Sequence, residues 1–389
     1  MHAALEVPLS ACADRVLRSL ARATGSAALA ELDGRTVLCE RAALGGMAIP
    51  GQTSAGGGCR LFDAIGDTIA LNLARAADRE LLPALFETDS LDLNDPGTIG
   101  RLVASRAAED LVSRGRTLGL AIAGEHESVP PPAVACTELA TGLPTVRPLR
   151  AVPRVLDLTA LWAGPLAGHL LWLGGAEVVK VESRTRPDAM RSGDEKLYAL
   201  LNQGKAHVSL DLTDHNDRQA LLSLVAGADI VIEAARPRAL AQLGIDAARL
   251  VQTTPGLVWI SITGHGAQGE AANWVGFGDD CGVRAGLSAA FRRACGHTGF
   301  VGDAIADPLT GIFAAYAAWE AWSSRRGGRF GLALSSVVAS CMAEVMEQDA
   351  CRFEASLRAW GAAAGQPFPT VRQRAIGAPG FLARPQWHR

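Results

Sequence analysis

The chain has 389 residues, of which 49% are hydrophobic and 20% are charged, and its formal net charge is -3 at pH 7. This length allows two globular domains of roughly 150 to 200 residues each, and the composition excludes an extensively disordered chain. The sequence contains no run of Lys or Arg, which argues against a nucleic acid or an anionic membrane as a partner.

The eight cysteines are scattered without a C-x-x-C pair, and the chain opens without the charged and apolar regions of a secretory signal. We therefore expect a cytoplasmic protein without structural zinc. The longest apolar runs are interrupted by Asp157, Pro165, His169 and Glu320. None reaches the roughly 20 residues that a membrane helix requires, so the sequence predicts a soluble protein.

The first 125 residues predict a small α+β domain. Residues 59–62 and 68–73 have the pattern of a hairpin around Gly66-Asp67, and helical patterns follow near 75–86 and 99–118. Six prolines then fall within residues 126–153, which show no sustained periodicity. We interpret that stretch as a linker.

Residues 154–345 predict a Rossmann-like large domain, followed by a C-terminal extension over 346–389. Short β-rich runs alternate with helical ones, which is typical of βαβ units and a mostly parallel sheet. The predicted strands are 154–158, 177–182, 207–212, 229–233 and 257–262. No G-x-G-x-x-G follows the first strand, so the pattern gives little support to dinucleotide binding. The fold class is therefore α/β, with a smaller α+β domain placed first.

Asp307 is the first candidate for chemistry. It precedes Pro308 and a long apolar helical pattern over 312–322. Proline in the first turn disfavours helical geometry for the residue before it, which predicts Asp307 as the N-cap. The local pattern alone favours a simple cap, although a carboxylate there can also act as a nucleophile.

Several other residues have a structural and a functional interpretation. Gly164-Pro165 follows the first strand, where backbone N–H groups can approach a phosphate, but a plain turn fits equally well. Cations follow the predicted strands, where they could bind phosphates or remain solvated: Arg184, Arg186, Lys205, Arg236 and Arg238. The triplet Gly56, Gly57 and Gly58 is either a flexible cover or an ordinary loop. The histidines have no metal-binding helical spacing, and no G-x-S-x-G elbow is present.

An ordered series of motifs resembles the class III CoA-transferase family, which includes formyl-CoA and carnitine CoA transferases and α-methylacyl-CoA racemases. The motifs are VLDLTALWAGPLAGHLLWLGGAEVVKVE (155–182), LNQGK (201–205), VSLDL (208–212), ADIVIEAARP (228–237), LGID (243–246), PGLVWISITGHG (255–266) and GDAIADPLTG (302–311). The resemblance covers close to half of the chain.

The resemblance implies that Asp307 is the catalytic carboxylate, which forms a mixed anhydride and then an aspartyl-CoA thioester. It implicates Ala163, Gly164, Arg184 and Arg236 in binding CoA. It also implies an interlocked homodimer. Coenzyme A would be a substrate, and no metal, flavin or nicotinamide cofactor is expected.

Two features depart from the family pattern. The segment 51–74, continuing to about residue 123, resembles the family's small domain but precedes the large one, so the order looks permuted. On that alignment Gly56, Gly57 and Gly58 match the glycine-rich loop that covers the catalytic aspartate in some transferases. The racemases carry a histidine base where this chain has Phe277, which cannot take a proton.

The sequence therefore predicts an enzyme that moves CoA from an acyl-CoA to a carboxylic acid through Asp307. Two alternatives stay open. One is a racemase or isomerase in which His265 or His297 replaces the missing histidine base. The other is a protein that binds acyl-CoA without turning it over. Substrate identity depends on the shape of the pocket and does not follow from these motifs.

Overall fold

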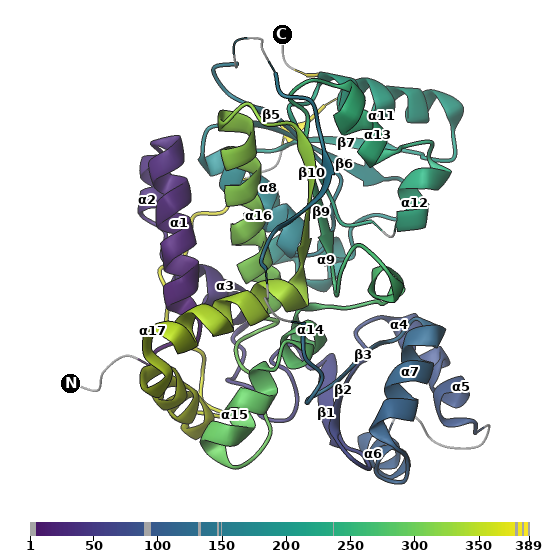
Figure 1. Ribbon diagram of the computed structural model, residues 1–389, viewed down its shortest axis with the longest axis vertical. Coiled ribbons are helices and arrows are strands. Elements are labelled where there is room, and N and C mark those ends of the chain that lie inside the picture. The colour runs from purple at the N-terminus through teal and green to yellow at the C-terminus, as the bar shows by residue number, and fades with distance from the viewer. Residues whose placement is uncertain are drawn as a thin grey trace.

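The computed structural model describes residues 5–88, 95–130, 134–145, 148, 150–235, 237–377, 380–382 and 385–387. These residues form an eight-stranded sheet and a separate three-stranded sheet. Figure 1 shows the three-stranded sheet and its helices below the large sheet. The expected α/β class, with a large mostly parallel sheet and a smaller α+β unit, is confirmed.

The large sheet has the strand order β11-β7-β6-β5-β8-β9-β10-β4. Its strands are β4 (Thr137–Thr141), β5 (Arg154–Asp157), β6 (Glu177–Ser183), β7 (Ala206–Leu210), β8 (Ile230–Glu233), β9 (Val258–Thr263), β10 (Gly328–Ala333) and β11 (Gly380–Phe381). All neighbours pair in parallel except β10 and β4. When β5 is counted as the first strand, the six central strands follow the Rossmann order 3-2-1-4-5-6.

Successive side chains along these strands point to opposite faces of the sheet and pack into two separate hydrophobic cores. Val155 of β5 points into the core beneath one set of helices, and its neighbour Leu156 points into the core on the other face. The first face is covered by α1 (Ser10–Thr24), α3 (Gly34–Gly45), α8 (Ala163–Leu173), α10 (Glu195–Asn202), α16 (Ala306–Ser323) and α17 (Leu334–Ala362). The second is covered by α11 (His215–Gly227), α12 (Pro237–Gln242) and α13 (Ala247–Thr253). Both faces are buried, as a doubly wound sheet requires.

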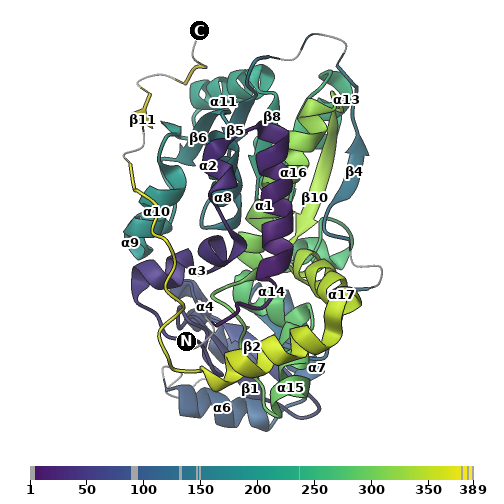
Figure 2. The same ribbon diagram turned by 90° about the vertical axis from the view of Figure 1, so that its left-hand side faces the viewer.

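The N-terminal helices belong to the large body. Leu17 and Leu20 of α1 are fully buried in the same core as α16. The short α2 (Ala27–Ala30) and then α3 follow, and Asp33 caps α3 by accepting a hydrogen bond from Thr36 N–H. Figure 2 shows these helices lying against α8 and α16. The helices of the first 50 residues therefore pack into the core of the large body and not into that of the small α+β unit with which the sequence grouped them.

The small unit contains the predicted hairpin. Strands β1 (Cys59–Asp63) and β2 (Thr68–Asn72) pair antiparallel, and β3 (Ala121–Gly124) extends the sheet. Each of the two predicted helices is divided in two, giving α4 (Ala76–Glu80), α5 (Leu82–Phe86), α6 (Pro96–Ala104) and α7 (Ala108–Leu118). The second division arises because Ile65 exchanges backbone hydrogen bonds with Arg106 and Ala108, which takes those groups out of a continuous helix.

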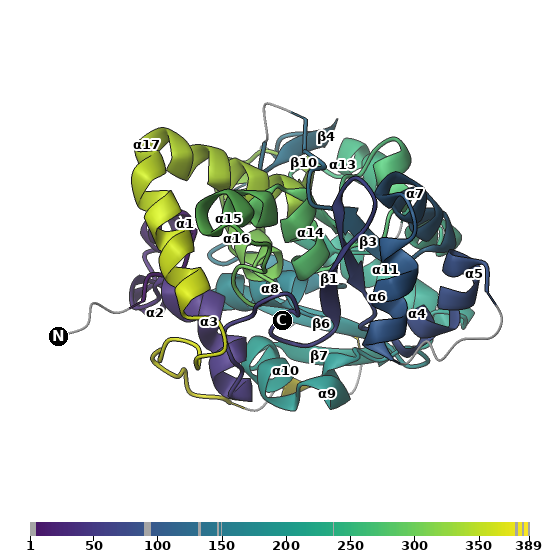
Figure 3. The same cartoon turned by 90° about the horizontal axis from the view of Figure 1, so that it is seen from below.

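One face of the small sheet packs against the large body. Cys59, Leu61 and Ala70 form a common cluster with Val283 of α14 (Gly278–Arg284) and with Phe300. Seen from below in Figure 3, β3 runs close to α14. The opposite face carries the unit's own core beneath α5, α6 and α7. The small unit therefore folds around its own core while resting on α14.

The proline-rich stretch is more ordered than a linker. It contains β4, which pairs antiparallel with β10 at the edge of the large sheet. Its side chains are exposed or only half-buried, so the sequence lacks the apolar alternation that would have indicated a strand. At the other end, α17 continues through residue 345 to Ala362. The chain then passes along α3 and α10 to add β11 beside β7 (Figure 2).

The remaining elements are α9 (Met190–Gly193), the 3-10 helix η1 (Glu270–Asn273) and α15 (Leu287–Cys295). None of the helices in the described ranges has the length and apolar character needed to cross a bilayer.

Candidate active site

A cavity of about 590 Å³ opens where β5, β8 and β9 end. Its walls include the loop residues Leu158 to Leu161 after β5, Ala234 and Ala235 after β8, and Gly264 after β9. The strand order reverses between β5 and β8, and open α/β sheets bind their ligands at such a switch point. Asp307 lies in the same wall, so the topology and the motif indicate one site.

Asp307 lies in the first turn of α16, one residue after the helix begins at Ala306. The prediction that Asp307 is the N-cap is therefore wrong. Ile305 takes the N-cap position with helical torsions, and Asp307 N–H donates to the carbonyl of Ala304 at 2.9 Å. Pro308 is tolerated there because the first turn of a helix leaves its N–H groups without intrahelical partners. The side chain of Asp307 is thereby free to face the cavity.

The carboxylate of Asp307 is held from the opposite side by α14. Gly278 N–H donates to Asp307 Oδ2 at 3.0 Å. A Cβ atom at position 278 would lie 2.4 Å from this oxygen and 2.2 Å from the carbonyl oxygen of Ala304. Only glycine permits such a close approach. The contact therefore depends on the absence of a side chain at residue 278.

Two further carboxylates, Asp279 and Asp303, lie behind Asp307. Burial raises the pKa of Asp307 to about 7, and the negative charges of Asp279 and Asp303 add to the rise. Burial likewise raises the pKa of Asp303 to about 7. The opposing cation is Arg41, whose Nη1 lies 3.3 Å from Asp303 Oδ1. The cluster therefore holds protons near neutral pH more tightly than free carboxyl groups do.

Arg41 reaches this cluster from α3, far from the motifs in sequence. Its guanidinium stacks 5.1 Å from the ring centroid of Trp162, and its Nε lies 3.7 Å from Asp194 Oδ2. The side chain is mostly buried. Aromatic contact and two carboxylates hold the guanidinium in one place. No motif in the sequence indicated this residue.

Buried lysines fix the loop after β5. Lys205 Nζ lies 2.8 Å from Asp157 Oδ2 and donates to the carbonyl of Pro165 at 2.8 Å. Lys180 Nζ donates to the carbonyl of Thr159 at 2.7 Å. Although burial alone would raise it, the two ammonium groups hold the pKa of Asp157 at about 2. Both lysines therefore serve the shape of the loop, and Lys205 does not face the cavity as a phosphate ligand.

The residues predicted to bind CoA occupy different places. Ala163 and Gly164 line the cavity, and a Cβ at position 164 would collide with the side chain of Thr159 at 2.3 Å. Arg184 is exposed outside the cavity wall, and its Nη2 lies 3.2 Å from Asp217 Oδ2 of α11. Arg236 falls outside the described residues. The motif therefore correctly placed the turn at Ala163 and Gly164 in the cavity wall. Arg184 instead lies outside the wall, next to Asp217.

Gly56, Gly57 and Gly58 lie behind the carboxylate cluster and are not among the residues that line the cavity. Gly56 leaves room for Arg41, since a Cβ there would lie 2.4 Å from Arg41 Nη2. Gly57 N–H donates to the carbonyl of Ser54 at 2.8 Å in a tight turn. In this arrangement the glycine loop contacts Arg41 and does not cover Asp307.

Three wall residues were not predicted as part of a site: Arg75, Trp274 and Phe277. Arg186, one of the cations that the sequence named as a possible phosphate ligand, also lines the wall. Arg75 comes from the start of α4 in the small unit, and its guanidinium lies 5.6 Å from the centroid of the Phe277 ring. Arg186 belongs to the loop after β6. Both are cations at the rim of a cavity that otherwise has mostly backbone and apolar walls. The sequence offered Arg75 only as one charged residue among many others.

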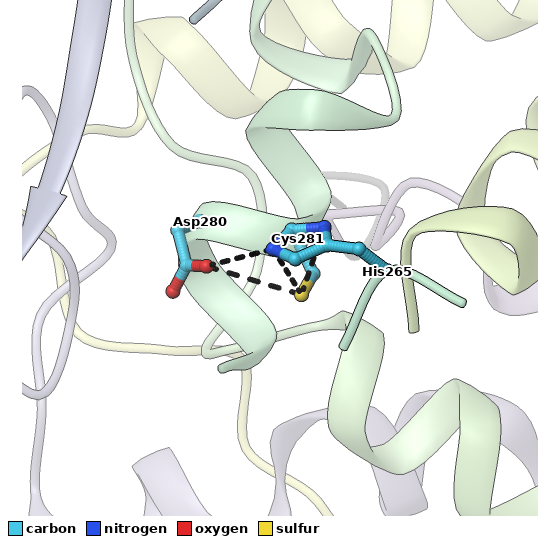
Figure 4. A group of neighbouring side chains, drawn as sticks. All are labelled: His265, Asp280 and Cys281. Atoms are coloured by element: carbon cyan, nitrogen blue, oxygen red, sulfur yellow. Dashed lines mark hydrogen bonds and ion pairs between the residues drawn. The ribbon is translucent and has the colours of Figure 1, made fainter. Parts of the chain in front are cut away.

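The two candidate histidines lie outside the cavity wall. His297 is exposed beside Phe291. His265 is buried with Asp280 and Cys281 (Figure 4), and burial lowers its pKa to about 3. Cys281 Sγ lies 3.9 Å from Nδ1 and 3.8 Å from Nε2 of His265, which places the sulfur off the lone-pair direction of Nε2. A shared metal ion requires both donors to point at it, so this geometry does not fit one.

A model of CoA-transferase family III matches residues 153–370. Succinyl-CoA–D-citramalate CoA-transferase of Chloroflexus aurantiacus is 34% identical over 194 residues, which is 46% of this chain and 46% of that protein. Succinate–glutarate CoA-transferase of Agrobacterium fabrum is 32% identical over 220 residues, 52% of this chain and 55% of that protein. The chain thus spans about half the length of these curated relatives.

A crystal structure of a hypothetical protein from Mycobacterium tuberculosis is 29% identical in sequence, with a TM-score of 0.46. The similarity covers 53% of this chain and 59% of that one.

Proposed function

The chain belongs to CoA-transferase family III, and we propose that it moves CoA from an acyl-CoA thioester to a carboxylic acid, with Asp307 as the nucleophile. The observation that supports this most strongly is the position of Asp307. Its carboxylate lies in the wall of the switch-point cavity, accepts one hydrogen bond from Gly278 N–H and has a raised pKa. A raised pKa makes the ionised carboxylate more basic, which favours attack on a carbonyl.

In the first half-reaction, an oxygen of Asp307 bonds to the thioester carbonyl carbon. The carbon–sulfur bond breaks, so CoA leaves as a thiolate and a mixed anhydride remains on Asp307. The thiolate then attacks the aspartyl carbonyl, which releases the donor's carboxylate and leaves an aspartyl-CoA thioester. The acceptor carboxylate reverses these two steps. Asp307 is regenerated, and no proton or electron is consumed over the cycle.

The cavity offers distinct places to the two parts of the substrate. The loop Leu158 to Leu161 and the turn at Gly164 provide backbone close to the thioester, and Arg186 stands at the rim for a phosphate. A second hollow of about 1170 Å³ lies beyond Trp274 and shares that residue and Asn273 with the first. We propose that the extended thioester and the acceptor together use both spaces.

The acceptor class that we propose is a dicarboxylic acid. Both relatives described above are named for succinate together with a second dicarboxylic acid. Arg75 at the rim could pair with the carboxylate that does not react. A homodimer and a cytoplasmic setting belong to the same proposal, and light scattering after size-exclusion chromatography measures the former.

The racemase alternative has no supporting observation in the cavity. Phe277 lines the wall beside Asp307 and has no group that exchanges protons, and neither His265 nor His297 is part of that wall. A protein that only binds acyl-CoA would keep affinity but form no covalent adduct. The covalent step therefore separates the two remaining functions.

The test uses the full chain with succinyl-CoA and a set of dicarboxylic acids, monitored by mass spectrometry. We expect new CoA esters to appear. In the presence of donor alone, hydroxylamine should convert Asp307 to its hydroxamate. Asp307→Asn should abolish both, whereas Asp110→Asn, at an exposed carboxylate of α7, should leave both unchanged. Binding of acyl-CoA without any adduct on Asp307 would contradict the proposal.

A further inference from the structure

Two cysteines far apart in the sequence meet between α1 and α17. Cys12 and Cys341 are both buried, and their Sγ atoms lie 2.8 Å apart. Two sulfur atoms in ordinary nonbonded contact stay farther apart than this. A disulfide bond measures about 2.05 Å. The separation of 2.8 Å between the two Sγ atoms therefore lies between a bonded distance and an ordinary nonbonded contact.

We propose that Cys12 and Cys341 are a disulfide-forming site that reversibly ties α1 to α17. The inference rests on the distance between the sulfurs and on the charged groups that surround Cys12. It does not depend on the proposed transferase activity. The sequence, which shows only scattered cysteines, gave no sign of the pair.

Among the described residues, charged groups contact Cys12 but not Cys341. Arg15 Nη2 lies 3.7 Å from Cys12 Sγ, and Arg15 binds both carboxylate oxygens of Glu344. Glu344 Oε2 lies 3.4 Å from the same sulfur and accepts the thiol hydrogen. The thiol of Cys12 therefore lies beside both a cation and a partly exposed carboxylate. Cys341 has no such cation in contact, and burial raises the pKa of its thiol.

These differences assign the two roles. With hydrogen peroxide as the oxidant, the sulfur of the Cys12 thiol attacks one oxygen and the oxygen–oxygen bond breaks. The departing hydroxide takes up the thiol proton, so that a sulfenic acid and one water form. The Cys341 sulfur then attacks the sulfur of the sulfenic acid. The sulfur–sulfur bond forms, a second water leaves, and the two thiols have lost two hydrogens in all. A low-molecular-weight thiol reverses the reaction by exchange.

The cross-link would join positions 329 residues apart, which is most of the chain. In the chain-entropy account, stabilisation grows with the length of the closed loop. The bond would also fasten the N-terminal helices, which precede the family-matched residues 153–370, to a helix inside that region. We therefore expect oxidation to raise the melting temperature.

The experiment treats the full chain with hydrogen peroxide and maps its peptides without reduction. Cys351→Ser serves as the background because Cys351 is exposed and could link two molecules. The expected result is one peptide pair joined through Cys12 and Cys341, with a melting temperature raised by about 5 °C or more and restored by dithiothreitol. Cys341→Ser should show neither change.

A second measurement keeps the outcome decisive if the serine variant is unstable. In the wild-type chain, exposed Cys351 reports whether the oxidant has acted. If Cys351 is oxidised while Cys12 and Cys341 remain alkylatable thiols after denaturation, the site does not exist. A cross-link from Cys12 to any cysteine other than Cys341 also overturns the assignment.

Discussion

At the scale of single residues, the position of Asp307 depends on a missing Cβ. Gly278→Ala should displace the carboxylate, because the new atom would lie 2.4 Å from Asp307 Oδ2. Under the proposed mechanism, we expect kcat to fall about 100-fold, since a nucleophile displaced by about 1 Å loses that much. KM should change little. Steady-state kinetics across acyl-CoA concentration measures both.

The matched control is Gly282→Ala on the same helix. The nearest atom to a Cβ at position 282 is Ile305 Cγ2 at 3.8 Å, which is ordinary contact. Its kcat should therefore remain near that of the wild type. If kcat falls equally in the two variants, alanine at any glycine of α14 disturbs the site, and the loss in Gly278→Ala does not report the contact with Asp307.

The pKa of Asp307 gives a pH prediction. Burial raises it to about 7, Arg41 opposes that rise, and Asp279 and Asp303 add to it. The reacting form is the ionised carboxylate, so kcat/KM should fall as the pH drops below about 7. Arg41→Gln removes the opposing charge and should move this limb to higher pH, whereas Arg41→Lys should move it less. If the fall of kcat/KM at low pH occurs at the same pH in Arg41→Gln as in the wild type, Arg41 does not influence the ionisation of Asp307.

At the scale of elements, α4 supplies a cation from the small unit to the cavity. Arg75 lines the wall and also donates to the carbonyl of Gly119 at 3.0 Å. If it binds the acceptor carboxylate, Arg75→Gln should raise KM for the acceptor about tenfold, because a charge-assisted hydrogen bond contributes roughly 1.5–3 kcal/mol.

The control for this prediction is Arg79→Gln. Arg79 lies on the same helix but is exposed outside the cavity wall, so KM should be unchanged. The melting temperature of Arg75→Gln separates a lost contact from a loosened small unit. An unaltered acceptor KM in a stable Arg75→Gln protein would exclude the residue from binding.

The elements that the sequence predicted well are those with strong periodic patterns. Strands β5, β6, β7, β8 and β9 all appear within a few residues of the predicted bounds, because their buried apolar runs alternate with helical segments. The strand β4 was missed because its side chains face solvent or lie half-buried. The division between α6 and α7 was missed because it follows from contacts with the distant Ile65.

The residues of the candidate site likewise fall into those that the sequence predicted and those that it did not. The motifs identified Asp307, Ala163 and Gly164, which line the cavity. Arg41 and Arg75 come from helices outside the matched region, and only the folded chain brings their guanidinium groups to the carboxylate cluster and the rim. Charge alone does not distinguish such arginines from the solvated ones.

At the scale of the whole molecule, the large body is assembled from both ends of the chain. Helix α1 contributes Leu17 and Leu20 to the core that α16 and α17 share. At the other end, Arg374 binds the buried carboxylate of Glu40 on α3. Residues outside the predicted large domain thus complete its core. The first 50 residues should therefore unfold together with the sheet rather than as a separate appendage.

Leu17→Ala tests this cooperativity. The side chain is fully buried against the large body, and such a truncation costs about 2–5 kcal/mol of unfolding free energy. We expect the main denaturant transition to shift to lower concentration as a single step with an unchanged slope. Arg18→Ala, at the exposed position beside it, should shift the midpoint little. If Leu17→Ala instead produces a separate early transition while the main midpoint stays fixed, α1 is an independent unit, and the N-terminal helices do not belong to the cooperative core.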